Sequence, residues 1–403
     1  MSPLPGAPTI AAKPQANNAA NNGASRPAAI VPFIRASHER SKLAFTDGPV
    51  TLNTTTQNRP NQAISPIGYL KSLTLEIVIT STGNSAAVAF QPDAPFNVLQ
   101  NVTFLTAAGE PILNLVDGYA LAMINKYLCI GSGPWDPVTD PNYSMVTGTG
   151  ANGGSATFVV RIPLELDTRD AFGALPNMAA NQAYQLQYSI NSLANIYSTA
   201  PTAAPTVTVN AEMEYWSTPA AATQGGAQQA IAPMGNGSVS LIQTQTPTIT
   251  PGAQQSIQSV NVGDTLRAWL LILRNSSGVR DESDFPNVLN MYVNGDPWYR
   301  KPKWKLRTEI ARRYGYNGAP TATPTAGAQD NGVFVISDLI SRGGHGDEKA
   351  QASSDRNAFL VTNSASGINF EAVSWGAGAS QLLIITNAIR VKDAASLYVP
   401  QVY

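Results

Sequence analysis

Histidine, cysteine and clustered charged residues are the groups in this sequence that are suited to chemistry. The 403-residue chain has two histidines, His38 and His345, which lie far apart in the sequence. A paired-histidine metal site or a nucleophile–histidine–acid triad requires such groups to converge, and this spacing supports neither. The single cysteine, Cys129, stands in an apolar run, so it cannot form a disulfide within the chain and is expected to be buried.

One glycine-rich segment, residues 342 to 348 (RGGHGDE), places a histidine and two carboxylates close together. These groups are possible ligands for a borderline metal ion. Ligands so close in sequence rarely converge on one ion, so a solvated loop is the expected structure. The sequence also lacks a phosphate-binding glycine loop, a dinucleotide fingerprint and zinc-type histidine spacing. We therefore predict no catalytic, cofactor-binding or metal-binding residues, and a protein that is not an enzyme.

The strongest charged motif is a run of cations that is interleaved with Trp298, Tyr299 and Trp304 and opposed by Glu309. It suits an anionic surface, either lipid headgroups or nucleic acid. The alternative, which we favour, is a solvated helix face whose cations pair with acidic groups of a neighbouring subunit. The members of this basic segment are Arg300, Lys301, Lys303, Lys305, Arg307, Arg312 and Arg313.

The composition favours strands joined by uncharged loops. Charged residues make up 13% of the chain, about half the usual share in soluble proteins. The net charge is −1, so no overall field draws the molecule onto nucleic acid, and we predict no sequence-specific binding to nucleic acid. Because neither a signal segment nor a membrane-length apolar stretch is found, we expect synthesis in the cytoplasm.

The composition also divides the chain into segments. Residues 1–28 are rich in Ala, Asn, Pro and Gly and predict an N-terminal arm, either free or docked on a neighbouring subunit. Two β domains are expected over residues 29–218 and 259–403. Residues 219–258 carry little charge and are expected to form the linker and the start of the second domain.

Alternating apolar and polar residues predict an all-β fold with two sandwiches. Residues 69 to 79 (YLKSLTLEIVI) carry leucine or isoleucine at every second position from 73 onward, the pattern of a half-buried strand. Trp269 and Trp375 lie in apolar strand runs and are expected in the core. Further strands are expected at residues 101–106, 157–166, 184–190, 207–216, 266–273, 287–293, 332–339, 358–362, 368–375 and 381–391.

The two halves repeat one another in order. The segment 95–99 (PFNVL) matches 285–289 (FPNVL), and the turn 109–111 (GEP) matches 295–297 (GDP). Each half then has one segment with a helical apolar stripe, beginning near Val116 in the first half and near Leu306 in the second. We interpret this order as a duplication of one β domain.

Five segments add a more specific pattern to the repeat: 161–166 (RIPLEL), 174–177 (ALPN), 184–190 (YQLQYSI), 271–280 (LILRNSSGVR) and 284–287 (DFPN). With them, the chain resembles the double jelly-roll major capsid proteins of tailless, membrane-containing bacteriophages, the tectiviruses, and of their lineage, which includes adenovirus. The similarity extends from about residue 30 to the end of the chain.

The resemblance implies two tandem eight-stranded jelly-roll β-sandwiches with short helices in the loops. It further implies a homotrimer whose six sandwiches form a nearly hexagonal capsomer that tiles an icosahedral shell, with the protein located in the virion. The implied partners are other copies of the chain, neighbouring capsomers, further capsid proteins such as a vertex protein, and an internal lipid membrane. In this family the chain ends tie capsomers together, a role that residues 1–28 and 397–403 would have here.

Three other classes of protein remain as alternatives. A coat protein of the mixed α+β class found in tailed phages would need more helix and more charge than this chain offers. A cell-surface or fibre β-sandwich that binds carbohydrate agrees with the Thr/Asn/Gly-rich loops, but a signal segment is not found. An enzyme built on a jelly roll would need metal ligands that the two histidines do not supply.

Overall fold

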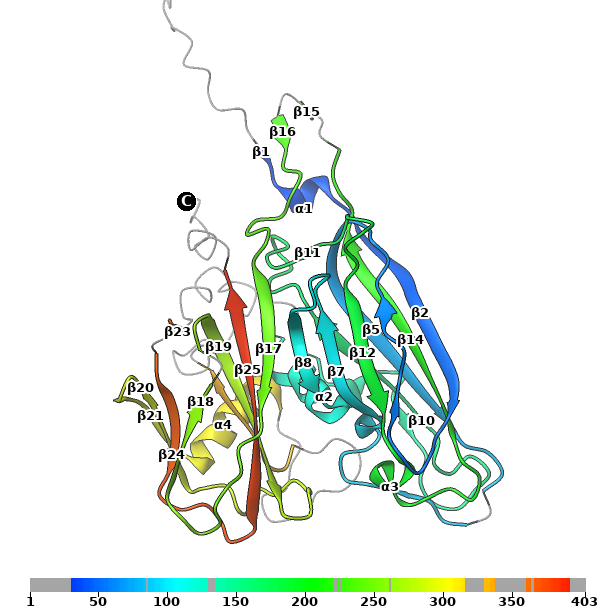
Figure 1. Ribbon diagram of the computed structural model, residues 1–403, viewed down its shortest axis with the longest axis vertical. Helices are drawn as coiled ribbons and strands as arrows, with labels where there is room; N and C mark the ends of the chain where they lie inside the picture. The colour runs from blue at the N-terminus through cyan, green and yellow to red at the C-terminus, as the bar shows by residue number, and fades with distance from the viewer. Residues whose placement is uncertain are drawn as a thin grey trace, which may run out of the picture.

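The computed structural model is a mostly β molecule of two sandwiches that lie side by side (Figure 1). The predicted arm of residues 1–28, the segment 342–348 and the C-terminal residues 397–403 lie outside the described residues. None of the helices in the described part of the chain has the length and apolar character needed to cross a membrane. The structure describes residues 30–84, 86–129, 135–220, 223–224, 227–260, 262–315, 330–337, 360–363 and 366–391.

The outer sheet of the first sandwich has the order β2-β14-β5-β10-β9, with β11 (Leu175–Pro176) paired to β5. In β5 the residues Leu73, Leu75, Ile77 and Ile79 are buried, as the alternation predicts. Their neighbours in the strand face outward, so one face of this sheet covers the core. The strands are β2 (Glu39–Thr51), β14 (Thr206–Trp216), β5 (Tyr69–Thr80), β10 (Ala156–Pro163) and β9 (Ser144–Met145).

The facing sheet of the first sandwich has the order β8-β7-β12-β3, with β4 (Gln62–Ala63) paired to β12. After β8 the chain forms α2 (Gly118–Tyr127), in which all ten residues are buried. This helix lies against β10 and corresponds to the helical stripe predicted near Val116. The strands are β8 (Pro111–Val116), β7 (Leu99–Leu105), β12 (Gln185–Ile190) and β3 (Gln57–Asn58).

The second sandwich repeats this arrangement with sheets of order β22-β19-β25-β17 and β18-β24-β20-β21. The short β23 (Leu360–Val361) pairs with β19, and α4 (Lys303–Tyr314) follows β21 as α2 follows β8. The strands are β22 (Val333–Ser337), β19 (Thr265–Asn275), β25 (Ala379–Arg390), β17 (Val239–Gln245), β18 (Gln255–Ser259), β24 (Ile368–Ala372), β20 (Val288–Val293) and β21 (Asp296–Pro302).

The predicted all-β fold of two eight-stranded sandwiches with short helices in the loops is therefore confirmed. Within the described residues, each sandwich has eight principal strands in equivalent positions, and each helix occupies the same connection. The segment 219–258 holds β17 and β18, which pair with β25 and β24 of the second sandwich. It therefore does more than link the domains, because its apolar positions, such as Leu241 and Ile257, complete the second core.

Among the described residues, five short strands and four short helices lie outside the two sandwiches. A small sheet of β1 (Ile30–Val31), β16 (Ala227–Gln229) and β15 (Thr223–Gln224) projects above the first sandwich beside α1 (Phe33–Ala36), and β6 (Ala89–Phe90) pairs with β13 (Tyr197–Thr199) (Figure 1). The connections also contain α3 (Leu193–Ile196) and the 3-10 helices η1 (Phe96–Val98) and η2 (Pro137–Thr139).

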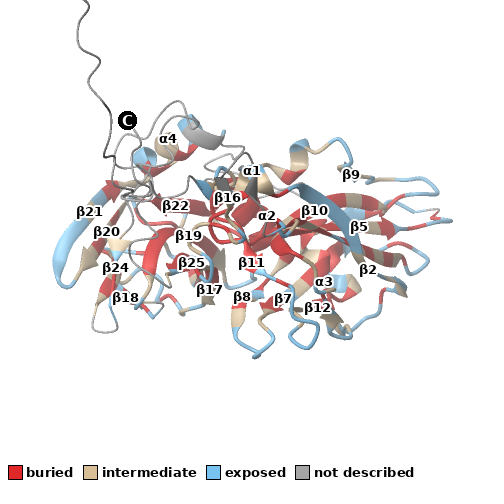
Figure 2. Cartoon of the chain, turned by 90° about the horizontal axis from the view of Figure 1, so that it is seen from above, coloured by how far each residue is buried: buried red, intermediate tan, exposed pale blue. Residues whose placement is uncertain are grey.

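The cores contain most of the large apolar side chains, and Figure 2 shows buried residues running through both sandwiches. Trp269 and Trp375 are both 1% exposed, which confirms the predicted core role of each. In the second core Phe285 stacks on Phe334 with ring centroids 3.6 Å apart. Cys129 is buried, as predicted. Burial of these side chains is the main favourable contribution to folding, roughly 1.5–3 kcal/mol for each large apolar residue.

Candidate functional site

The junction between the two sandwiches brings buried charged side chains of both together. A single parallel contact, Leu113 of β8 with Ile242 of β17, joins the inner sheet of the first sandwich to a sheet of the second. Beside it the Thr244 hydroxyl donates to the carbonyl of Asn114 at 3.1 Å. The two sheets thus become one ten-stranded sheet that runs through both sandwiches. Buried charges reinforce this contact.

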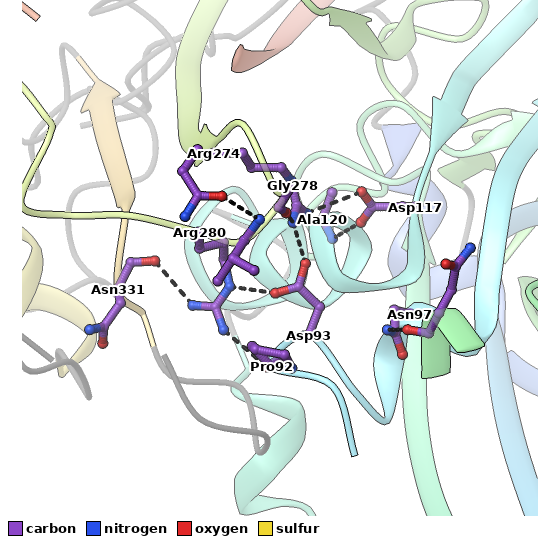
Figure 3. Close-up of polar contacts among 12 residues, drawn as sticks. Pro92, Asp93, Asn97, Asp117, Ala120, Arg274, Gly278, Arg280 and Asn331 are labelled. Atoms are coloured by element: carbon purple, nitrogen blue, oxygen red, sulfur yellow. Dashed lines mark hydrogen bonds and ion pairs between the residues drawn. The ribbon is translucent and has the colours of Figure 1, made fainter. Parts of the chain in front are cut away.

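Arg280 is the central residue of the junction (Figure 3). Its side chain is 0% exposed, and its Nε lies 2.6 Å from Oδ1 of Asp93, which belongs to the first sandwich. Two further N–H groups donate to the carbonyls of Asn331, at 3.0 Å, and Pro92, at 3.1 Å. The guanidinium also lies 4.2 Å from the ring centroid of Tyr119 in α2. Arg280 therefore connects the second sandwich to two parts of the first, the loop with Pro92 and Asp93 and the helix α2.

Arg274 makes the second connection at the same place. It pairs with the other carboxylate oxygen of Asp93, and its Nη2 lies 3.6 Å from Oδ2 of Asp117. Asp117 also caps α2, because its carboxylate accepts the backbone N–H of Ala120 at 2.6 Å. The orientation of the buried helix and the orientation of the second sandwich are thus linked through one aspartate.

The electrostatics of the junction favour its charged state. Burial by itself would raise the pKa of Asp93, but the adjacent guanidiniums of Arg274 and Arg280 outweigh burial and hold this pKa below the ordinary value. Burial would also lower the pKa of Arg274, yet Asp93 and Asp117 raise it above its ordinary value. The charged states of Asp93 and Arg274 are therefore stabilised by partners on the opposite sandwich, whereas burial raises the pKa of Asp117 above its ordinary value.

Acid should weaken this junction. The pKa of Asp93 in the folded protein lies below its ordinary value of 3.8, so the unfolded chain takes up this proton first as the pH falls. The contribution of Asp93 to stability is therefore complete above about pH 5 and is lost as the pH falls through the lowered pKa. We expect urea unfolding between about pH 5 and pH 3 to show a steeper loss of stability in the wild type than in Asp93→Asn. If the free energy of unfolding changed equally with pH in the wild type and in Asp93→Asn, this role of Asp93 would be contradicted.

A second ion cluster joins the sandwiches through α2. The Nζ atom of Lys126 lies 2.8 Å from a carboxylate oxygen of Asp136 and 2.8 Å from one of Asp330. Asp330 precedes β22 of the second sandwich and is fully buried, while Lys126 is 3% exposed. Burial would lower the pKa of Lys126, but the two carboxylates raise it above its ordinary value. The two clusters fix α2 between the sandwiches.

An open cavity of about 400 Å³ adjoins the junction. Its walls carry Asp93, Asp117 and Arg274 together with the amides of Asn97 and Asn191. These charged groups already pair with one another. Among the described residues no group of three or more His, Cys, Asp and Glu side chains could hold a metal ion. The arrangement is suited to holding two domains in one orientation.

The structure divides the predicted basic segment into two sets. Three of its cations are used within the chain. Lys301 lies 2.7 Å from Glu309, Lys303 donates to the carbonyls of residues 282, 283 and 285, and Arg307 pairs with Glu282. The first of these contacts joins β21 to α4, and the other two fasten α4 to the loop before β20.

The second set of the basic segment faces solvent. Arg300 on β21 and Lys305 and Arg312 on α4 are exposed. The side chain of Arg313 lies outside the described part of the chain. The sequence could not separate the two sets because their difference depends on which acidic groups and carbonyls the fold brings to the helix.

Sequence reasoning missed the junction residues as functional groups. Arg274 and Arg280 lie in the segment that carries the family resemblance, and Asp93 precedes the repeated segment 95–99. Their ion pairs join positions more than 180 residues apart. The sequence marks these junction residues only weakly, by two arginines that flank a turn in a chain with few charges.

Comparison with known proteins identifies the fold. No protein-family model matches the chain, and no curated protein matches it significantly. Solved structures do match over most of the chain. The atomic structure of Sulfolobus Turreted Icosahedral Virus matches with a TM-score of 0.59 and 12% identity, covering 88% of this chain and 91% of that one.

Two further structures show the same likeness. The PBCV-1 virus capsid matches with a TM-score of 0.54 and 11% identity, over 88% of this chain and 93% of that one. The major capsid protein P2 from bacteriophage PM2 matches with a TM-score of 0.50 and 9% identity, over 89% and 99%. The chain therefore has the double jelly-roll fold known from viral major capsid proteins.

Proposed function

We propose that this chain is the major capsid protein of an icosahedral virus, a structural component of the virion and not an enzyme. The observation that carries the proposal is that the two sandwiches have the same strand order and are joined by buried ion clusters. The near-complete coverage of capsid structures supports it. A shell needs units that keep their shape under load, and buried charge pairs across the domain junction supply that rigidity.

The assembly we propose is a homotrimer that presents six similar sandwiches. Closed three-fold symmetry with two equivalent domains in each chain produces a nearly hexagonal block, which can tile a lattice. In this scheme residues 29–218 form the first jelly roll, residues 259–403 form the second together with β17 and β18 of the segment 219–258 that leads into it, and residues 1–28 act as an arm between capsomers. A tailless bacteriophage with an internal membrane, and a vertex protein as partner, are the finer features of this proposal.

Light scattering after size exclusion tests the proposed trimer. The purified protein is expected to elute with three times the 42.5 kDa mass of one chain and to keep this mass on dilution. Stable association requires roughly 1,000 Å² or more of complementary surface, which the sides of two sandwiches can provide. A monomer at all concentrations would contradict the proposed capsomer.

A further inference from the structure

A small apolar cluster attaches the first described elements of the chain, β1 and α1, to the end of the first sandwich (Figure 1). It is separate from the two main cores. The rings of Phe33 and Tyr69 pack edge to face in it, with centroids 5.2 Å apart, and residues 230 and 232, which follow β16, pack against it. Its buried members come from α1, β5, the loop after β10, and β14: Phe33, Tyr69, Ala171, Ala174 and Trp216.

A buried carboxyl group lies directly against this cluster. Glu165 is 2% exposed, and its Oε1 accepts the indole N–H of Trp216 at 2.8 Å. Its Oε2 is also buried and has no hydrogen-bond partner among the described residues. A carboxylate removed from water needs several donors or a paired cation, which a single N–H group does not supply. The geometry therefore favours the neutral, protonated carboxyl.

The electrostatics around Glu165 favour the same protonated state. Burial is the largest influence and raises the pKa of Glu165 from its ordinary value of 4.5 to about 8. The N–H group of Trp216 and the ammonium group of Lys71 oppose this rise, whereas the carboxylates of Glu39 and Asp167 add to it. Lys71 already forms an ion pair with Glu39. A charge on Glu165 would thus be compensated only in part.

The other charged groups beside the cluster point to solvent or have partners. Arg169, in the loop after β10, pairs with Asp167 at 3.1 Å. Arg35 of α1 and His38, which follows this helix, are exposed. The segment 230–232 (AIA) carries no charged residue. Within the described part of the chain, the elements that cover the cluster therefore bring no counter-ion to the buried carboxyl.

We propose that protonated Glu165 is a latch that holds β1 and α1 on the first sandwich, and that its ionisation releases them. A newly formed carboxylate gains most from water, and water reaches it when α1 moves away and uncovers Trp216. The main cores need not open, because this cluster is separate from them. Any use of the latch in assembly rests on the proposed function, in which residues 1–28, directly before β1, act as an arm. Release would free that arm to reach a neighbouring capsomer.

The direction of the pKa shift sets the pH range of the latch. The pKa of Glu165 is about 8 while the cover is in place, above the ordinary value of 4.5 expected once water reaches the group. The closed state therefore binds this proton more tightly than the released state. The latch is strongest below about pH 4.5, weakens as the pH rises towards about 8, and is weakest above that.

Limited trypsin digestion of the full-length protein tests the latch. Cleavage after Arg35 requires α1 to leave the cluster and unfold locally, and mass spectrometry identifies this cut. Glu165→Gln keeps the shape of the side chain but cannot ionise, and its comparison with the wild type at each pH cancels the pH dependence of trypsin. The ratio of the wild-type rate to the Glu165→Gln rate is expected to rise at least roughly tenfold between about pH 6 and about pH 9.

Two further variants make the test specific. Glu214→Gln removes another carboxylate from the same end of β14, one that accepts the Ser72 hydroxyl at 2.6 Å, and it should keep the wild-type pH dependence. Phe33→Ala should speed cleavage after Arg35 at both pH values, because it removes the main apolar contact of α1.

Three results would overturn the latch. They are a ratio of wild-type to Glu165→Gln rates that does not change with pH, a rise that Glu214→Gln abolishes, and a Phe33→Ala variant that is cleaved no faster than the wild type. The digestion needs no assembled shell. A latch that fails would therefore leave the proposed capsid function standing, and a protein that does not assemble could still show the latch.

Discussion

Replacing Arg280 with methionine is expected to lower the free energy of unfolding by about 3–5 kcal/mol. The side chain is 0% exposed and pairs with Asp93, while its remaining N–H groups satisfy the carbonyls of Pro92 and Asn331. Methionine fills similar volume but donates no hydrogen bonds, so the buried carbonyl of Asn331, the partly buried carbonyl of Pro92 and one carboxylate oxygen lose their donors. Urea unfolding followed by tryptophan fluorescence, at one protein concentration, measures the loss.

Arg390→Met is the matched control for this prediction. Arg390 is also an arginine of the second sandwich, but its side chain is 54% exposed and its carboxylate partners lie 3.4 and 3.7 Å away. Its replacement should change the free energy of unfolding by less than about 1 kcal/mol. If Arg280→Met lowered the free energy of unfolding as little as Arg390→Met, the buried junction would contribute little to stability. The interpretation that the junction holds the two sandwiches rigidly would then be wrong.

Replacing Lys126 with methionine should cost a similar amount, about 3–5 kcal/mol. The ammonium group lies between Asp136 and the fully buried Asp330, so its removal leaves an uncompensated buried carboxylate. A second change, Asp330→Asn, removes that charge while keeping nearly the same side-chain volume. The double variant should therefore be more stable than Lys126→Met alone.

The same urea titration measures the free energy of unfolding of both Lys126 variants. The difference between these two values tests the prediction. Recovery of about 1 kcal/mol or more in the double variant assigns the loss to the unpaired charge at Asp330. A double variant that is less stable than Lys126→Met would show that Asp330 is held by its other contacts and that Lys126 acts only by packing.

Together the two clusters connect the sandwiches at different points of α2. Asp117 caps the start of this helix and contacts Arg274, whereas Lys126 near its end contacts Asp330. Motion of one sandwich relative to the other would separate charges inside a region of low dielectric constant. A capsomer built from such chains would transmit load between sandwiches without bending at the junction.

Local patterns of residues are enough to predict the fold class and the repeat of this chain. Alternation over residues 69–79 predicts β5, and the apolar stripes near Val116 and Leu306 predict α2 and α4, because side-chain periodicity is a local property that burial of one face imposes. The sequence also predicted the buried positions of Trp269 and Trp375. It missed β2, whose residues are mostly exposed and therefore lack the apolar alternation that marks a strand.

Which charged side chains form ion pairs depends on tertiary contacts and cannot be predicted from local sequence. Arg280 and Asp93 are separated by 187 positions, and Lys126 and Asp330 by 204, so no local pattern links them. The same holds for the basic segment, where Lys301 turns inward to Glu309 and Arg300, one position earlier, faces outward. Hydrophobic periodicity depends on neighbours along the chain, whereas the pairing of buried charges depends on which distant elements folding brings within a few ångströms.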